Sequence, residues 1–77
     1  MSEYIDALRD VVGETAPAPE VMAPYLEKVH LRAYAITDND VEELKAAGLS
    51  EDEIFEQTVA AAIGEGLRRL DAAEAVL

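Results

Sequence analysis

The amino-acid sequence predicts an all-α protein with four helices, and three observations support this. Apolar residues recur at spacings of three and four positions along most of the chain, as they do on the buried side of a helix. Two segments begin with a hydroxyl residue that is followed three positions later by an acidic residue, which is the pattern of a helix capping box. No stretch alternates apolar and polar residues over the length of a strand.

The first helix is expected to begin after a cap at Ser2 and to end near Val12. Its apolar stripe is narrow and consists of Ile5, Leu8 and Val12. Gly13 and the proline-rich segment after it are expected to end the helix, because proline removes a backbone donor and biases the preceding residue away from helical angles.

The chain therefore divides into an N-terminal helix (residues 1–14), a proline-rich linker (15–19) and a helical domain (20–77). With 77 residues it is one small domain. The linker would allow the first helix to pack on its own domain or, by swapping, on a neighbouring subunit.

The second helix is expected to start at Pro19 or Glu20 and to run to Ala35. Pro24 falls in its early part, so the helix either restarts there, with proline at its first position (N1), or is kinked. The residues expected along its apolar side are Met22, Tyr25, Leu26, Val29 and Ala33.

The third helix is expected over Asp38–Ala47, after an N-cap at Thr37 that pairs with Asp40. Gly48 can take the left-handed conformation that ends a helix, so the helix is expected to stop there. The side chains of this helix expected to face the core are Val41 and Leu44.

The fourth helix is expected to follow Ser50, which pairs with Glu53 in the second capping box, and to continue to Ala75. Gly64 and Gly66 lie inside it, although glycine in a helix costs about 1 kcal/mol relative to alanine. Small residues are tolerated where another helix crosses closely, within the chain or between subunits. The apolar positions of this helix are Phe55, Val59, Ala62, Ile63, Gly66, Leu67, Leu70 and Ala73. The positions expected to pack between subunits are Ala62, Gly66, Leu67 and Leu70.

The composition favours a homo-oligomer. The chain is 51% hydrophobic, whereas a domain of this size buries only about 60–65% of its unfolded surface. It has no cysteine for a disulfide and no cluster of histidine and cysteine for a structural zinc site. Association with further copies is then the simplest way to cover the remaining apolar surface.

The formal net charge of −11 arises from 17 acidic and 6 basic residues. Because this charge repels phosphate backbones and anionic lipids, we expect neither nucleic acid nor a membrane as a partner. No apolar run reaches the roughly 18 residues of a membrane span, and the first residues lack the pattern of a secretion signal. We therefore expect a cytoplasmic protein.

A motif joins the third and fourth helices, TD-x-DV-x-x-L-x-x-AGLSEDEI, and an alanine-rich helix with an Arg-Leu pair follows it. Its residues are Thr37, Asp38, Asp40, Val41, Leu44, Ala47, Gly48, Leu49, Ser50, Glu53, Ile54, Arg69 and Leu70. The motif resembles the carboxymuconolactone decarboxylase and alkylhydroperoxidase D-like superfamily. The resemblance implies a helical, usually oligomeric protein.

Many members of that superfamily carry peroxide-linked thiol chemistry on a Cys-x-x-Cys-x-x-x-His motif. Measured back from His30, the two cysteine positions hold Ala23 and Leu26, and neither can form a thiolate. The resemblance therefore transfers no catalytic residue to this chain. The decarboxylase branch does not depend on cysteine, which leaves an enzyme open.

Glu27 and His30 are the sharpest candidates for a metal site. Three positions apart on a helix, they face the same way, and Glu-x-x-His is the pair that carboxylate-bridged di-iron bundles use. At a subunit interface, Glu56 or Glu65 of the last helix would add oxygen ligands. The alternative is a solvated or hydrogen-bonded surface histidine. The sequence identifies no particular metal or cofactor.

His30 is also the candidate general acid or base of a cysteine-independent, decarboxylase-like enzyme, with Tyr25 and Arg32 beside it in a pocket between subunits. The alternative places Tyr25 at the edge of the core. Our leading expectation is a non-redox homo-oligomeric helical module with a structural or binding role, alone or with a larger protein partner. The enzyme hypothesis requires a partly buried His30 near another subunit, whereas the module hypothesis predicts an exposed one.

Overall fold

The computed structural model describes residues 3–76, and this part of the chain is all-helical. The all-α class is therefore confirmed, while the expected cap at Ser2 lies outside the described residues. No strand occurs between residues 3 and 76. The elements, in chain order, are α1 (Glu3–Glu14), the short 3-10 helix η1 (Glu20–Met22), α2 (Ala23–Leu31), a second 3-10 helix η2 (Ala33–Ala35), α3 (Asp38–Ala46) and α4 (Glu51–Ala75).

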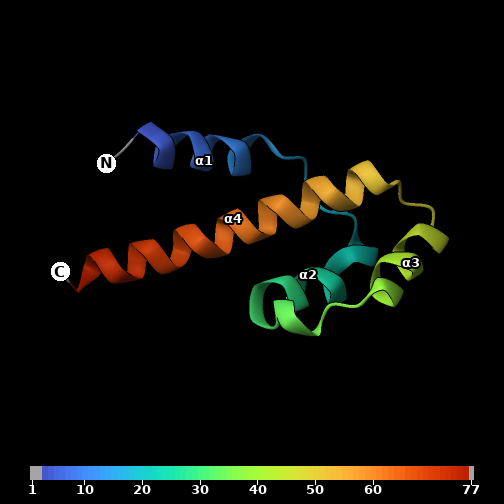
Figure 1. Ribbon diagram of the computed structural model, residues 1–77. Coiled ribbons are helices and arrows are strands. Elements are labelled where there is room, and N and C mark those ends of the chain that lie inside the picture. Colours follow the sequence, from blue (N-terminus) through green and yellow to red (C-terminus); the bar gives the residue numbers. More distant parts are fainter. Residues whose placement is uncertain (1–2, 77) are drawn as a thin grey trace.

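The long helix α4 is the central element (Figure 1). The N-terminal helix α1 runs antiparallel along one side of it, and α2 and α3 pack on another side. The predicted first helix thus packs on α4 of its own chain. As a result, both ends of the described chain lie at the same end of the molecule.

A small core forms where α2, α3 and the first half of α4 meet. Met22 is its only side chain with no exposed surface. Leu44 faces this core as predicted, and Val41 is packed partly against it. The buried members of the core are Met22, Tyr25, Val29, Leu44, Ile54 and Ala61.

Both predicted capping boxes are present. At the start of α3 the Asp40 amide donates to Thr37 Oγ1 at 3.3 Å, and the Thr37 amide donates to Asp40 Oδ2 at 2.9 Å. At the start of α4 the same exchange joins Ser50 and Glu53. Each box satisfies backbone donors that a helix start leaves open, so both helices begin where the sequence predicted.

The loop between α3 and α4 turns at Gly48, whose φ of +100° is the only positive φ among the described residues. The Leu49 amide then donates to the Leu44 carbonyl at 3.2 Å, which satisfies an open acceptor at the end of α3. The helix ends at Ala46, one residue before the predicted end.

The second helix is shorter than predicted. A helix does restart near Pro24, but at Ala23, so that proline is the second helical residue and not the first as predicted. The helix ends at Leu31 rather than Ala35. Arg32 leaves the helical region with φ −149° and ψ 56°. No glycine or proline lies at this break. We attribute the break to tertiary packing, because Ile36 packs partly against the core after the chain has turned. Residues 33–35 form the separate helix η2.

The first helix is longer than predicted. It continues through Gly13 to Glu14 rather than ending near Val12. The chain leaves the helix at Thr15, whose amide and hydroxyl both donate to the Val11 carbonyl, at 3.1 and 2.7 Å. One glycine is too weak a signal to stop a helix that already packs against α4.

The buried face of α4 differs from the expected stripe. Of the eight expected apolar positions only Leu67 is fully buried, and Phe55, Ala62, Gly66 and Ala73 are exposed. The covered positions are instead Ile54, Ala60, Ala61 and Leu67. The reason is that α1 and α2 cover two separate sides of α4. The apolar side of α4 that neither helix covers remains exposed to solvent.

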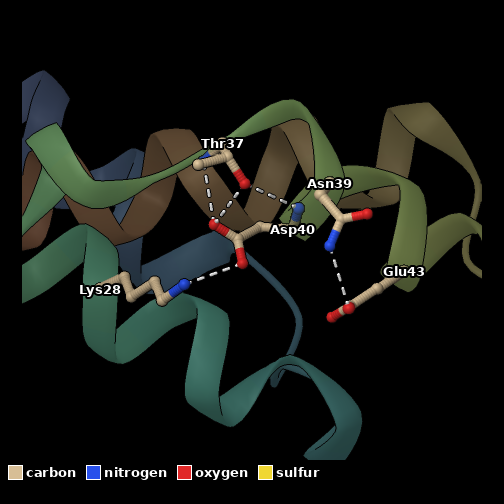
Figure 2. A network of polar contacts seen from close by, with 5 residues as sticks. All are labelled: Lys28, Thr37, Asn39, Asp40 and Glu43. Carbon is tan, nitrogen blue, oxygen red and sulfur yellow. Dashed lines mark hydrogen bonds and ion pairs between the residues drawn. The ribbon is translucent and has the colours of Figure 1, made fainter.

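A polar network links α2 to the start of α3 (Figure 2). Lys28 Nζ donates to Asp40 Oδ1 at 2.8 Å, while the other oxygen of this carboxylate caps Thr37. The hydrogen bond from Lys28, followed by that from the Thr37 backbone, holds the pKa of Asp40 below its ordinary value of 3.8. One carboxylate therefore serves as both helix cap and interhelical contact.

Replacement of glycine by alanine should have opposite effects at two positions. Gly48→Ala should lower the free energy of unfolding by about 1 kcal/mol or more, because alanine is strained at this positive φ. Gly64→Ala should raise it by about 1 kcal/mol, since a Cβ there meets no atom within 4 Å and alanine favours the helix. Urea denaturation at one protein concentration measures the free energy of unfolding of both variants. A change in the same direction in both would contradict these roles of Gly48 and Gly64.

The Lys28–Asp40 contact should make stability depend on pH in the acid range. Asp40 has a lowered pKa in the folded state, so its contribution is present at neutral pH and is lost as the pH falls past 3.8 and through the lowered pKa. Lys28→Met should therefore unfold more easily than the parent at neutral pH, with the difference shrinking on acidification. Lys45→Met is the comparison. Lys45 also holds the pKa of Glu51 below its ordinary value, so the same trend is expected, but a smaller one, because Glu42 and Glu51 are far more exposed than Asp40. A difference independent of pH would refute this role.

Candidate functional site

The candidate His30 lies in the last turn of α2 and faces Glu65 in the middle of α4. Its Nδ1 is 3.4 Å from Glu65 Oε2. Because an ionised carboxylate only accepts hydrogen bonds, this contact requires a proton on Nδ1. His30 therefore links α2 to α4 as a hydrogen-bonded histidine and is half-buried. The exposed His30 that the module hypothesis predicts is wrong, because the ring contacts Glu65 of α4. The second subunit that the enzyme hypothesis places beside His30 stays a prediction.

Glu65 also receives two arginine side chains from its own helix. Arg68 Nη1 lies 3.1 Å from Glu65 Oε2, and Arg69 Nε lies 3.2 Å from Oε1. The removal of water around this carboxyl, which is 19% exposed, would by itself raise its pKa. Hydrogen bonds from Arg69 and His30, with the charges of both arginines, outweigh this effect and hold the pKa below 4.5. Glu65 is therefore an ionised anchor and a weak base.

Tyr25 has a structural partner for its hydroxyl. The Tyr25 oxygen is 2.8 Å from Thr58 Oγ1, and Thr58 donates its own proton to the Ile54 carbonyl at 2.6 Å. Tyr25 must then be the donor to Thr58. The ring is buried in the core, so Tyr25 connects α2 to α4 through both packing and a hydrogen bond.

A single chain does not bring Tyr25, His30 and Arg32 together. Tyr25 borders a cavity of about 270 Å³ between α2 and α3. His30 borders a different depression, of about 470 Å³, between α2, η2 and α4. Arg32 is exposed and lines neither of them. A catalytic site completed by a second subunit stays a prediction.

A metal site at Glu27 and His30 is likewise not assembled within a single chain. Glu27 is exposed, and His30 contacts Glu65. Glu56 borders a groove on the α1 side of α4. Between residues 3 and 76, no three carboxylate, histidine or cysteine side chains are grouped so that they could hold a metal ion. A site that draws ligands from Glu27 and His30 of two subunits stays a prediction.

The structure has two exposed apolar surfaces, of which the sequence analysis singled out only Ala62 and Gly66. The first, the α2–α4 face, comprises Leu31, Tyr34, Ala62 and Gly66, which border the depression beside His30. The second, the α1–α4 groove, has a volume of about 550 Å³ and is formed by Val11, Phe55 and Val59 with Glu14 and Glu56. The sequence did not show that Tyr34 belongs to the α2–α4 face, because nothing in it predicts that α2 ends at Leu31. The early end of α2 places Tyr34 on η2, where it is 88% exposed.

The predicted subunit-packing positions fall partly on these surfaces. Ala62 and Gly66 are exposed and belong to the α2–α4 face. Leu70 is half-buried. Leu67 is buried within its own chain, beside Val12 of α1, and is not available to a second copy. Packing of Ala62, Gly66 and Leu70 against a second subunit stays a prediction.

No protein-family model, curated protein sequence or solved structure matches this chain. The resemblance to the alkylhydroperoxidase D-like superfamily therefore rests on the motif of the sequence alone. Among the described residues, no helix combines the length and the apolar character that crossing a bilayer requires.

Removal of the Tyr25 hydroxyl distinguishes a structural role from a catalytic one. Tyr25→Phe should lower the free energy of unfolding by about 1 kcal/mol, which is the usual net contribution of one buried hydrogen bond. Tyr34→Phe is the matched control and should have no effect, because this hydroxyl has no partner in the described part of the chain. Equal stability of Tyr25→Phe and the parent in urea would argue against the structural role.

Proposed function

We propose that this chain is a small, non-redox helical module that assembles with further copies of itself and has a structural or binding role. The observation that carries the proposal is its excess of exposed surface. The chain exposes 5512 Å², whereas a compact monomer of 8.3 kDa exposes about 4,600 Å². The difference, about 900 Å², is close to the 800 Å² or so that each partner contributes to a standard protein interface.

The shape of the chain supports the same proposal. Its radius of gyration is 13.8 Å, whereas a compact domain of 77 residues has about 11.5 Å. Five large apolar side chains are each at least 66% exposed: Tyr4, Leu31, Tyr34, Phe55 and Val76. Apolar side chains that remain open in an extended monomer are typical of a protein-binding surface.

The α2–α4 face is the surface that we assign to self-association. A Cβ added to Gly66 would meet no atom of its own chain within 4 Å, so nothing inside the subunit requires glycine there. A helix of a second copy that crosses closely at Ala62 and Gly66 would account for a residue that otherwise weakens α4. Exposed Tyr34 and Leu31 then supply apolar area around the crossing.

The charges of this face suit a second copy of an acidic chain. Arg68 and Arg69 lie beside it, with side chains 68% and 75% exposed even though both contact Glu65. The exposed carboxylates of another copy complement these arginines. The overall charge of −11 makes polyanions such as nucleic acids poor partners for the same module.

The proposal includes descent from the alkylhydroperoxidase D-like superfamily with loss of its thiol centre. Support comes from the motif between Thr37 and Leu70, whose two capping boxes and Gly48 turn have the structure expected of them. The complete lack of cysteine leaves no thiol for peroxide chemistry.

Gly66→Leu should convert the assembly to monomers, because the leucine side chain would hold the crossing helices apart. Native mass spectrometry of protein purified without added metal measures subunit number directly. Gly64→Ala is the control and should keep the parent's subunit number, since its change in helix propensity is similar but Gly64 faces the α1 side. Circular dichroism should show that both variants remain helical.

A monomeric parent, or an unchanged subunit number in Gly66→Leu, would overturn self-association through this face. The same spectra test the metal hypothesis independently. Stoichiometric excess mass in the parent that is absent from a His30→Ala variant would establish a metal site at His30 instead of a purely structural module.

A further inference from the structure

We propose that the α1–α4 groove is a binding site for a basic amphipathic helix of another protein. This inference goes beyond self-association, because it concerns a different surface and a different kind of partner. It rests on the shape of the groove, on its apolar lining and on the charges around it.

The groove has the form that a third helix requires. Two antiparallel helices, α1 and α4, form its sides, and the segment after α1 closes one end with Thr15 and Ala16. A helix binds in such a groove by inserting apolar residues spaced three and four positions apart. The groove lies between the last turn of α1 and the first turns of α4, and its volume of about 550 Å³ is enough for several such side chains.

The apolar lining continues along α1 beyond the groove itself. Tyr4, Leu8 and Val11 occupy positions i, i+4 and i+7, so they lie on one face of α1, and all three are exposed. On α4 the aromatic ring of Phe55, 67% exposed, and the side chain of Val59 face Val11 across the groove. An exposed aromatic side chain is the type of residue that often carries much of the binding energy in protein interfaces.

The charged residues that line the groove are both acidic. Glu14 approaches it from α1 and Glu56 from α4, so the apolar floor has a carboxylate on each side. Lysine or arginine residues that flank the apolar face of an incoming helix complement this arrangement.

A second copy of this chain does not supply that complement. It has six lysine and arginine residues in all, and every one except Arg32 already forms an ion pair with an acid among the described residues. The charges therefore favour a basic partner at this groove, in contrast to the α2–α4 face with its two arginines.

The test uses the full chain and three synthetic peptides of about 18 residues, long enough to form helix. The first has leucine at positions i, i+3, i+4 and i+7 with lysine elsewhere. The second replaces each lysine with glutamate, and the third scrambles the first. Fluorescence anisotropy of labelled peptide should show binding of the lysine peptide only, and its affinity should fall as salt is added.

Variants locate the binding surface. Phe55→Ala should weaken the lysine peptide by about tenfold or more. The double change Glu14→Gln with Glu56→Gln should weaken it and reduce the salt dependence. Tyr34→Ala is the matched control, because it removes an equally exposed aromatic from the α2–α4 face and should leave the affinity within about twofold.

Several results would overturn the proposal. These are no binding of the lysine peptide at millimolar concentration, equal binding of the glutamate or scrambled peptide, or no effect of Phe55→Ala. Amide NMR shifts of Val11, Phe55 and Val59 that depend on protein concentration without peptide would identify a second copy as the occupant. Concentration-dependent shifts confined to Tyr34, Ala62 and Gly66 would report self-association and leave this proposal standing.

Discussion

The structure depends on α4 being packed by helices that are too few and too short to surround it. At 1.5 Å per residue its 25 residues extend about 38 Å, whereas α2 and α3, with nine residues each, extend about 14 Å. α1 covers one side and the α2–α3 pair covers part of another. The remaining side of α4 is left to solvent in the single chain, and both exposed apolar surfaces border on it.

The distribution of charge follows from the same arrangement. A hydrogen bond from His30 joins α2 to Glu65 of α4. Cations are scarce in this chain, and three further contacts between different helices each use one: Arg9 with Asp71, Lys28 with Asp40, and Lys45 with Glu51. Such pairs contribute little free energy at the surface, so their role is to orient helices that a small core holds loosely. The acids that remain without a cation then give the outer surface its negative charge, including the acidic sides of the α1–α4 groove.

The features that the sequence predicted well are those determined by neighbours in the chain. The starts of α3 and α4 follow from Thr37 with Asp40 and from Ser50 with Glu53, and the turn between them follows from Gly48. These are local hydrogen bonds and one local backbone angle, so a short stretch of sequence determines them.

The features that the sequence did not predict depend on contacts between distant segments. The choice of Ile54 rather than Phe55 as the buried residue depends on which sides of α4 are covered, and both are apolar residues at helical spacing. The end of α2 at Leu31 depends on the route of the chain to Ile36, and no residue near Arg32 favours a break. His30 was singled out, but its partner Glu65 lies 35 positions away, and Glu56 was an equally good candidate by sequence.

The two exposed surfaces differ in a way that suggests different partners. Around Gly66 the neighbouring charges are of both signs, because Arg68 and Arg69 exceed what Glu65 alone can neutralise. Around Phe55 the neighbouring charges are acidic only. An acidic chain can complement the first surface with its own carboxylates but not the second. We propose that the incomplete covering of α4 leaves one surface for copies of the chain and one for a basic helix from elsewhere, since either partner would cover apolar surface that the single chain leaves exposed.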